Sequence, residues 1–204
     1  MKKFFFEPIY SSRKSRARTG RIHTPHGIID TPGFVGVGTN GTLKSLDNAL
    51  VQDMLQLMFC NTYHLLLQPG PQVVKKAGGL HKFIHRKTPI ITDSGGFQVF
   101  SLAYGSVANE LKSRGLKKQD GGVLKITEEG VLFRSYRDGA KIHLTPESSI
   151  QAQKDFGADI ILCFDELPPY HIHDNLLKSS LARTHRWEER SLREHEKNPN
   201  DQAI

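Results

Sequence analysis

Short apolar stretches broken by Gly and Pro dominate the first forty residues, and "GRIHTPHGIIDTPGFVGVGT" (residues 20–39) is typical of hairpins and irregular strands. From Leu43 the pattern changes. We expect a helix around Leu46–Met54, an apolar strand over Leu57–Cys60, and a helix that begins at Pro71 and ends at Gly78-Gly79. The apolar strand "PIIT" follows and stops at Asp93.

The second half of the chain contains a polar surface excursion over residues 104–122 and then an alternating stretch. Glu129-Gly130 and Asp138-Gly139 give that stretch two hairpin signals. Thr145 as N-cap and Pro146 as first helical residue predict a helix that ends near Gly157. The strand "DIILCF" then ends at Asp165. In the last predicted helix, residues 175–197, apolar positions recur at helical spacing among charged residues: Leu177, Leu181, Ala182 and Leu192.

Alternating strands and helices favour an α/β fold with parallel strands. Three of the apolar strands run directly into a polar residue, namely Asn61, Asp93 and Asp165. In barrels and in open α/β sheets, the carboxyl ends of the strands carry the chemistry. For each residue taken alone, an Asx turn or a helix cap is the favoured interpretation. Three such residues in succession make a functional rim equally favoured.

Composition and charge limit the class of protein. The sequence has no run of about 18 apolar residues, so we expect no membrane span. Two distant cysteines, Cys60 and Cys163, are typical of a reduced cytoplasmic protein without a disulfide. The net charge is +7, with basic clusters at Arg13–Arg21 and Lys112–Lys118. These clusters suit a polyanion such as nucleic acid, or else a solvated, solubilising face.

The stretch "TDSGGFQ" after the strand suggests a site for a flat ligand. Two carboxylates, Asp93 and Asp165, suit either chemistry at a sugar acetal carbon or recognition of the N–H edge of guanine. The residues that follow Asp93 would serve such a base in three ways: small residues let backbone amides approach it, an aromatic ring covers it, and an amide both donates and accepts. These residues are Ser94, Gly95, Gly96, Phe97 and Gln98.

The stretch "TDSGGFQVFSL" resembles the signature of the tRNA-guanine transglycosylases, or queuine tRNA-ribosyltransferases. Other segments with the same resemblance are "NTYHLLLQPG", "RTGRIHTPHGIIDTPGFVGVGTNGTLKSL", "LTPESSIQAQKDFGADIILCFDELPPY" and "RTHRWEERS". The resemblance implies a (β/α)8 TIM-type barrel preceded by a small antiparallel sheet. It also implies exchange of guanine at the tRNA wobble position for a 7-deazaguanine, of the bacterial precursor type by preference, without an organic cofactor.

By matched position, the resemblance makes Asp93 the catalytic proton acceptor and Asp165 the reader of the base's N–H edge. Residues 94–97 line the base pocket, Gln98 is a further base-contacting candidate, and His64 is structural rather than a metal ligand. The family's nucleophilic aspartate and its Cys-x-Cys-x-x-Cys…His zinc site lie beyond the residues given. We therefore expect one incomplete barrel domain over 1–204, with an amino-terminal β segment over about 1–40 and βα units over 41–204, and no metal ligands in it.

The full-length protein is expected to be a cytoplasmic homodimer that binds tRNA and carries structural zinc, whereas residues 1–204 alone are expected to be inactive. Two other hypotheses stay open. One is a non-catalytic tRNA-binding subunit of the same family, in which the cluster Arg13–Arg21 contacts phosphates. The other is a sugar-cleaving hydrolase on a similar barrel.

Overall fold

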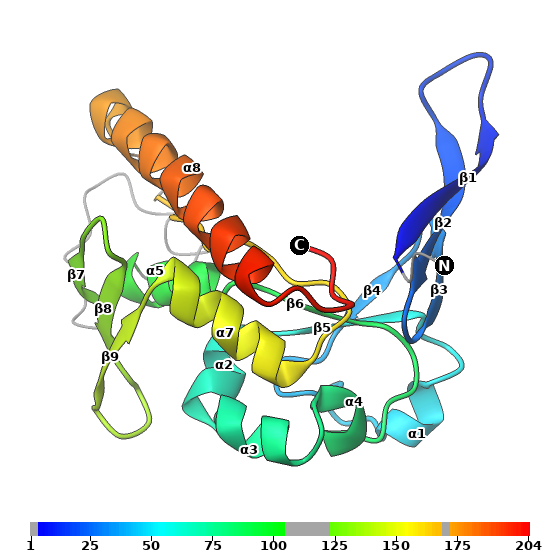
Figure 1. The fold of residues 1–204 in the computed structure, drawn as a ribbon, viewed down its shortest axis with the longest axis horizontal. Helices are drawn as coiled ribbons and strands as arrows, with labels where there is room; N and C mark the ends of the chain where they lie inside the picture. Colours follow the sequence, from blue (N-terminus) through cyan, green and yellow to red (C-terminus); the bar gives the residue numbers. More distant parts are fainter. Residues whose placement is uncertain (1–3, 105–122, 169–171) are drawn as a thin grey trace. The chain divides into compact units, whose positions relative to one another are not determined.

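The computed structural model describes residues 4–104, 123–168 and 172–204 (Figure 1). The predicted excursion and the basic cluster Lys112–Lys118 therefore lie almost wholly outside the described residues. The chain divides into two compact units. Unit 1 comprises Met1–Asp93, Gln153–Ile161 and Pro199–Ile204, and unit 2 comprises Ser94–Ala152 and Leu162–Asn198.

Unit 1 begins with an antiparallel sheet of β1 (Phe5–Ser11), β2 (Arg18–Thr24) and β3 (Gly27–Thr31), in that order. This confirms the predicted small amino-terminal antiparallel sheet. The basic cluster lies in the β1–β2 hairpin, where Arg13, Lys14, Arg16 and Arg18 are exposed. Arg21 on β2 forms an exposed ion pair with Asp30 on β3, with 3.1 Å between Nε and Oδ1.

A parallel sheet forms the core of unit 1. Its strands are β4 (Val35–Val37), β5 (Leu57–Cys60) and β6 (Ile90–Thr92), in sequence order, so the strand predicted over Leu57–Cys60 is confirmed. Single parallel bridges extend the sheet from Ile91 to Ile160 and from Ile160 to Ala203. Within the described ranges these segments do not close into a barrel, and the predicted strand "DIILCF" is reduced to its bridge at Ile160.

Four short helices accompany this sheet: α1 (Asn48–Val51), α2 (Thr62–Leu67), α3 (Pro71–Lys76) and α4 (Leu80–Phe83). The helix predicted around Leu46–Met54 is shorter, because Asp47 caps it by accepting a hydrogen bond from the Ala49 N–H at 2.8 Å. The helix predicted from Pro71 is confirmed as α3. The structure adds α2 and α4, which the sequence pattern did not predict.

Unit 2 contains α5 (Gly96–Tyr104), the antiparallel strands β7 (Val123–Ile126), β8 (Val131–Arg134) and β9 (Lys141–Leu144), and α8 (Asp174–Lys197). The two predicted hairpin turns are confirmed, since β7, β8 and β9 pair in sequence order. Helix α7 (Pro146–Phe156) begins in unit 2 and ends in unit 1. Its predicted cap is confirmed as well, because Thr145 Oγ1 accepts the Ser148 N–H at 3.2 Å.

The buried face of α8 differs from the apolar stripe that the sequence suggests. Leu177, Leu181 and Leu192 are 45%, 54% and 43% exposed. The buried residues are instead Ser180, Trp187, Ser191 and His195. Trp187 supplies the apolar area by stacking on Phe164, with 4.9 Å between ring centroids, and the Phe164 N–H donates to Ser191 Oγ at 3.1 Å. Small serines thus let the main chain approach the helix closely.

Candidate functional site

Asp93 follows β6 and is held by residues that follow the neighbouring strand β5. The parallel register pairs Cys60 with Thr92, so the next residues along each strand are Asn61 and Asp93. Asn61 Nδ2 donates to Asp93 Oδ2 at 2.7 Å, and the Thr62 N–H donates to Asp93 Oδ1 at 2.6 Å. All three residues are buried. Both carboxylate oxygens are thereby fixed in direction.

Thr62 makes a second contact with the same residue, since its hydroxyl donates to the Asp93 carbonyl oxygen at 2.6 Å. The sequence pattern singled out Asn61 as a polar strand end but missed Thr62. A signal for it existed, because Thr62 begins helix α2 and its backbone N–H therefore has no partner within the helix. The Asp93 carboxylate takes the place of that partner.

In unit 2 the glycine-rich stretch converges on Asp165. Ser94 Oγ donates to Asp165 Oδ1 at 3.0 Å, and the Gly96 N–H donates to Ser94 Oγ at 3.2 Å. A Cβ atom on Gly96 would lie 2.6 Å from the carbonyl oxygen of Asp165, so this position requires a residue without a side chain. Gly95 has φ +85°, in the left-handed region that favours glycine.

The remaining residues of the stretch differ in their environment. Phe97, on α5, is 47% exposed, and its role in covering a flat ligand stays a prediction. Gln98 has a buried Oε1 atom without a hydrogen-bond partner among the residues that the structure describes. Ser149, which the sequence analysis missed, supports the stretch through its hydroxyl, which donates to the Ser94 carbonyl oxygen at 2.7 Å.

The structure therefore brings together two groups of predicted residues, each within its own unit. Asp93 is in unit 1 with Asn61 and Thr62, whereas the Ser94–Gln98 stretch and Asp165 are in unit 2. The convergence of Asp93 and Asp165 on one ligand stays a prediction. His64, which was interpreted as structural, contacts the edge of the Tyr63 ring, with 5.2 Å between centroids.

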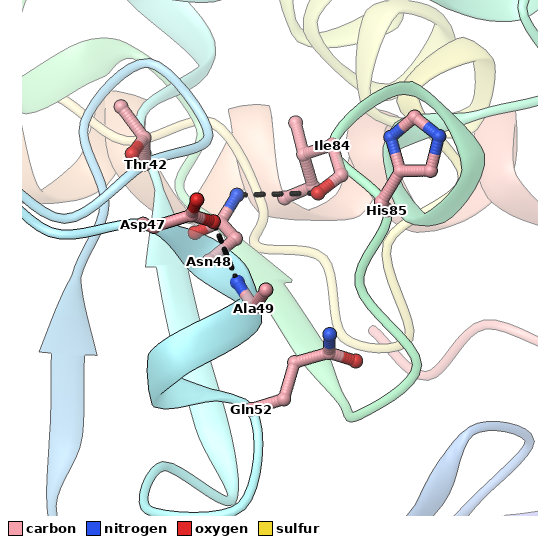
Figure 2. A pocket seen from close by; sticks show the side chains of 7 residues that line it. All are labelled: Thr42, Asp47, Asn48, Ala49, Gln52, Ile84 and His85. Carbon is pink, nitrogen blue, oxygen red and sulfur yellow. Dashed lines mark hydrogen bonds between the residues drawn. The ribbon is translucent and has the colours of Figure 1, made fainter.

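Figure 2 shows a pocket of about 560 Å³ in unit 1 that none of the predicted residues lines. Its lining is Thr42, Asp47, Asn48, Ala49, Gln52, Ile84 and His85. Asn48 crosses it, with Nδ2 donating to the carbonyl oxygens of Gly41 at 3.0 Å and Ile84 at 3.2 Å. The chemistry of the predicted residues, rather than the size of this pocket, identifies the candidate site.

Among the described residues, two sets of side chains are possible metal ligands, namely the two cysteines and one cluster that contains histidines. Cys60 and Cys163 are both free thiols, as predicted. Burial raises the pKa of Cys60 to about 12, only partly offset by Arg86, so this thiol is protonated at neutral pH and is not a thiolate nucleophile. Within the described ranges, one group of side chains has metal-ligand chemistry, namely His26, His81 and Asp159, and the sequence analysis missed it.

Comparison with known proteins decides the family. The model of the family described as "Queuine tRNA-ribosyltransferase" matches residues 12–204 of this chain. The chain belongs to the queuine tRNA-ribosyltransferase family. It is 75% identical over 202 residues to the queuine tRNA-ribosyltransferase of Protochlamydia amoebophila, covering 98% of this chain and 52% of that relative. With the protein of the same name from Chlamydia abortus the identity is 59% over 199 residues, covering 98% and 53%.

The chain thus spans about half the length of the curated queuine tRNA-ribosyltransferases that it matches. Its two cysteines cannot supply the three-cysteine zinc site that the resemblance implied, and zinc ligands outside these residues stay a prediction. No helix within the described ranges combines the length and the apolar character that a membrane span requires.

Proposed function

We propose that the protein containing this chain is a tRNA-guanine transglycosylase, which exchanges guanine at the tRNA wobble position for a 7-deazaguanine. Family membership supports the reaction class, and the fixed carboxylate of Asp93 is the observation that carries the assignment of roles. Asn61 and Thr62 hold both oxygens of this carboxylate through short hydrogen bonds. A carboxylate held in this way keeps one orientation while a proton is transferred to it.

The exchange proceeds in two displacements at ribose C1′. A nucleophilic aspartate, expected outside these residues, attacks C1′ of the flipped-out nucleotide, the bond to guanine N9 breaks, and guanine leaves with a proton that the Asp93 carboxyl group gives up, which makes Asp93 a carboxylate for the second displacement. The incoming deazaguanine gives its N9 proton to Asp93, attacks C1′ and releases the nucleophile. One glycosidic bond replaces another, so no redox or nucleotide cofactor enters the balance.

Asp165 is assigned to the donor edge that guanine and the incoming base share. A carboxylate is acceptor-only, and it matches the adjacent N–H groups of that edge through charge-assisted hydrogen bonds. The Ser94 hydroxyl orients it through Oδ1 at 3.0 Å, and Gly96 leaves room beside it. Phe97 would cover the base, worth about 1–3 kcal/mol per stacked base. Gln98, whose Oε1 has no hydrogen-bond partner within the described ranges, could accept a further N–H.

The complete fold belongs to the same proposal. The parallel segments β4, β5, β6, Ile160 and Ala203 follow one another in sequence order, without the reversal that defines a doubly wound sheet. This order supports a (β/α)8 barrel completed by residues outside the chain. We further propose tRNA contact through the exposed cluster Arg13–Arg21, a homodimer, and structural zinc bound by residues outside this chain.

Labelled-guanine incorporation into tRNA tests the proposal in the longest natural form of the protein that contains residues 1–204. Asp93→Asn should lower incorporation by at least about 100-fold, the lower end of what a positioned acid or base contributes. Asp165→Asn should lower it by about 5- to 150-fold, which corresponds to the loss of about 1–3 kcal/mol from one recognition contact. Asp155→Asn is the matched control, because Asp155 is also a buried aspartate but pairs with Lys75 and Gln72. Full incorporation by both site variants would overturn the assignment.

A non-catalytic tRNA-binding subunit would give a different result. It would bind tRNA with an affinity that falls steeply with salt, yet the wild type would incorporate no guanine. A sugar-cleaving hydrolase would release free sugar without tRNA. Measuring binding and incorporation on the same preparation therefore separates the three hypotheses.

A further inference from the structure

Three segments of unit 1 meet at a cluster of two imidazoles and one carboxylate. His26 lies in the turn between β2 and β3, His81 lies in α4, and Asp159 follows α7. His26 Nδ1 is 2.8 Å from Asp159 Oδ1, and His81 Nε2 is 3.2 Å from Asp159 Oδ2. The two imidazole rings stack, with 3.5 Å between centroids. One potential ligand atom from each residue lies within 4.8 Å of the others.

One imidazole nitrogen of the cluster makes no hydrogen bond within the described residues. His81 Nε2 is buried and, in the part of the chain that the structure describes, makes no hydrogen bond of acceptable geometry, although it is close to the carboxylate. Asp159 is fully buried as a side chain and accepts the Ile90 N–H at 2.9 Å. Burial raises the pKa of Asp159, but the approach of His81, the Ile90 N–H and His26 outweighs it and lowers the pKa to about 2.

We propose that His26, His81 and Asp159 form a binding site for a divalent transition-metal ion, of which Zn²⁺ is the best match. Two imidazole nitrogens and one carboxylate oxygen are the donor set that Zn²⁺ accepts in three-ligand sites with one open position. Tetrahedral ligands at about 2.0–2.2 Å from the ion lie about 3.3 Å from one another. The two imidazoles approach different oxygens of the carboxylate, His26 Nδ1 at 2.8 Å from Oδ1 and His81 Nε2 at 3.2 Å from Oδ2. Each separation is close to that edge length, and one ring must shift toward the oxygen that binds the ion.

Binding requires one local adjustment. Both rings must direct a nitrogen lone pair at the same ion, so the stacked pair has to tilt apart. His26 is the ring that moves, because its side chain is 41% exposed whereas that of His81 is 10% exposed. The Ile90 N–H meanwhile holds Asp159 in place, as an outer partner does for a ligating carboxylate.

The consequence of binding is a cross-link inside unit 1. An ion at this position joins the β2–β3 turn to α4 and to the residue before the Ile160 bridge, segments that are up to 133 positions apart in sequence. Ligands that bind only the folded state stabilise it in proportion to their occupancy. The site uses none of the residues assigned to base exchange, so the stabilisation expected from an ion bound there is independent of the proposed function.

Metal content and melting temperature test the proposal in the longest natural form of the protein. After equilibration with micromolar free Zn²⁺ and gel filtration, the wild type should retain one Zn²⁺ per chain more than His26→Ala or Asp159→Asn. Asparagine keeps the acceptor for the Ile90 N–H, so the second variant tests the ligand rather than the fold. Zn²⁺ should raise the melting temperature of the wild type by at least about 3 °C and leave both variants unchanged.

His23→Ala is the matched control. His23 is also a partly buried histidine of the same sheet, and it too pairs with a carboxylate, with 2.9 Å between Nε2 and Glu7 Oε2. It should bind as much Zn²⁺ as the wild type. Equal zinc in the wild type and His26→Ala would overturn the proposal, as would a Zn²⁺-induced shift of melting temperature that survives in Asp159→Asn.

Discussion

Replacing Gly96 by alanine tests how closely the glycine-rich stretch approaches Asp165. The added Cβ would lie 2.6 Å from the Asp165 carbonyl oxygen, 3.0 Å from its Oδ1 and 3.2 Å from Ser94 Oγ. Ordinary van der Waals contact begins at 3.4 Å, so the shortfall at the carbonyl is 3.4 − 2.6 = 0.8 Å. The obstacle is a backbone atom and cannot rotate away. Either α5 or the segment carrying Asp165 must move.

A displacement of this size has two measurable consequences. Forcing extra volume into a packed site costs about 1–3 kcal/mol of the free energy of unfolding. It also strains the hydrogen bond from Ser94 Oγ to Asp165 Oδ1, and a displacement of about 1 Å at a positioned group costs about 100-fold in rate. We therefore expect Gly96→Ala to lower guanine incorporation by about 100-fold while the protein stays folded.

Urea unfolding followed by tryptophan fluorescence measures the first effect, because the chain has a single tryptophan, Trp187, buried in unit 2. Gly139→Ala is the control. Its φ of +74° imposes backbone strain of about 1–2 kcal/mol, but nothing lies within 4 Å of its Cβ, so incorporation should be unaffected. Unchanged stability and unchanged incorporation in Gly96→Ala would refute the close approach.

Three further predictions concern stability and thiol chemistry. Trp187→Phe should cost about 1–2 kcal/mol rather than the 3–5 of Trp187→Ala, because the Glu128 carbonyl oxygen that loses the indole N–H at 2.8 Å still accepts from Arg190 at 2.6 Å. Since both variants remove the fluorescent side chain, their urea unfolding is followed by circular dichroism. Burial raises the pKa of Glu147, but its bidentate pairing with Arg190 outweighs this and lowers the pKa below 4.5. The ion pair should therefore stabilise the fold above pH 4.5, and this stabilisation should be lost as the pH falls further. Glu147→Gln should flatten the dependence of the urea midpoint on pH in that range. Cys60, with its pKa raised to about 12, should react with iodoacetamide at pH 8 only after urea is added, as mass spectrometry would show; rapid labelling of the folded protein would contradict its burial.

The elements that the sequence predicted well are those with strong local signals. The strand Leu57–Cys60 is an apolar run that ends at a polar residue, and the start of α7 is marked by Thr145 and Pro146. Helix α2 was missed because Thr62, Tyr63 and Leu65 are all buried, so no polar face reveals a helical period. Helix α5 was missed because it begins in the glycine-rich stretch, which was interpreted only through its contacts with a ligand.

In the candidate site, too, some features follow from the local sequence and others depend on tertiary packing. The residue types after each strand identified Asp93 and Asp165, and the glycines beside them indicated close backbone approach. The donors to Asp93 could not be read from the residue pattern, because they depend on the register between β5 and β6. The buried face of α8 was assigned wrongly for a similar reason: packing selects Ser180 and Ser191, which a hydrophobic pattern does not count.

The register of β5 and β6 links the fold to the proposed chemistry. Cys60 pairs with Thr92, and so the two residues that follow, Asn61 and Asp93, meet through a hydrogen bond of 2.7 Å. Side chains alternate along a strand, so a slip of one residue would turn Asp93 to the opposite face of the sheet and leave its carboxylate without these donors. The buried core residues Met58 and Ile90 oppose such a slip, because either would then leave the apolar interior. The apolar strands thus fix the direction of the carboxylate, and the residues beyond their ends are free to carry the chemistry.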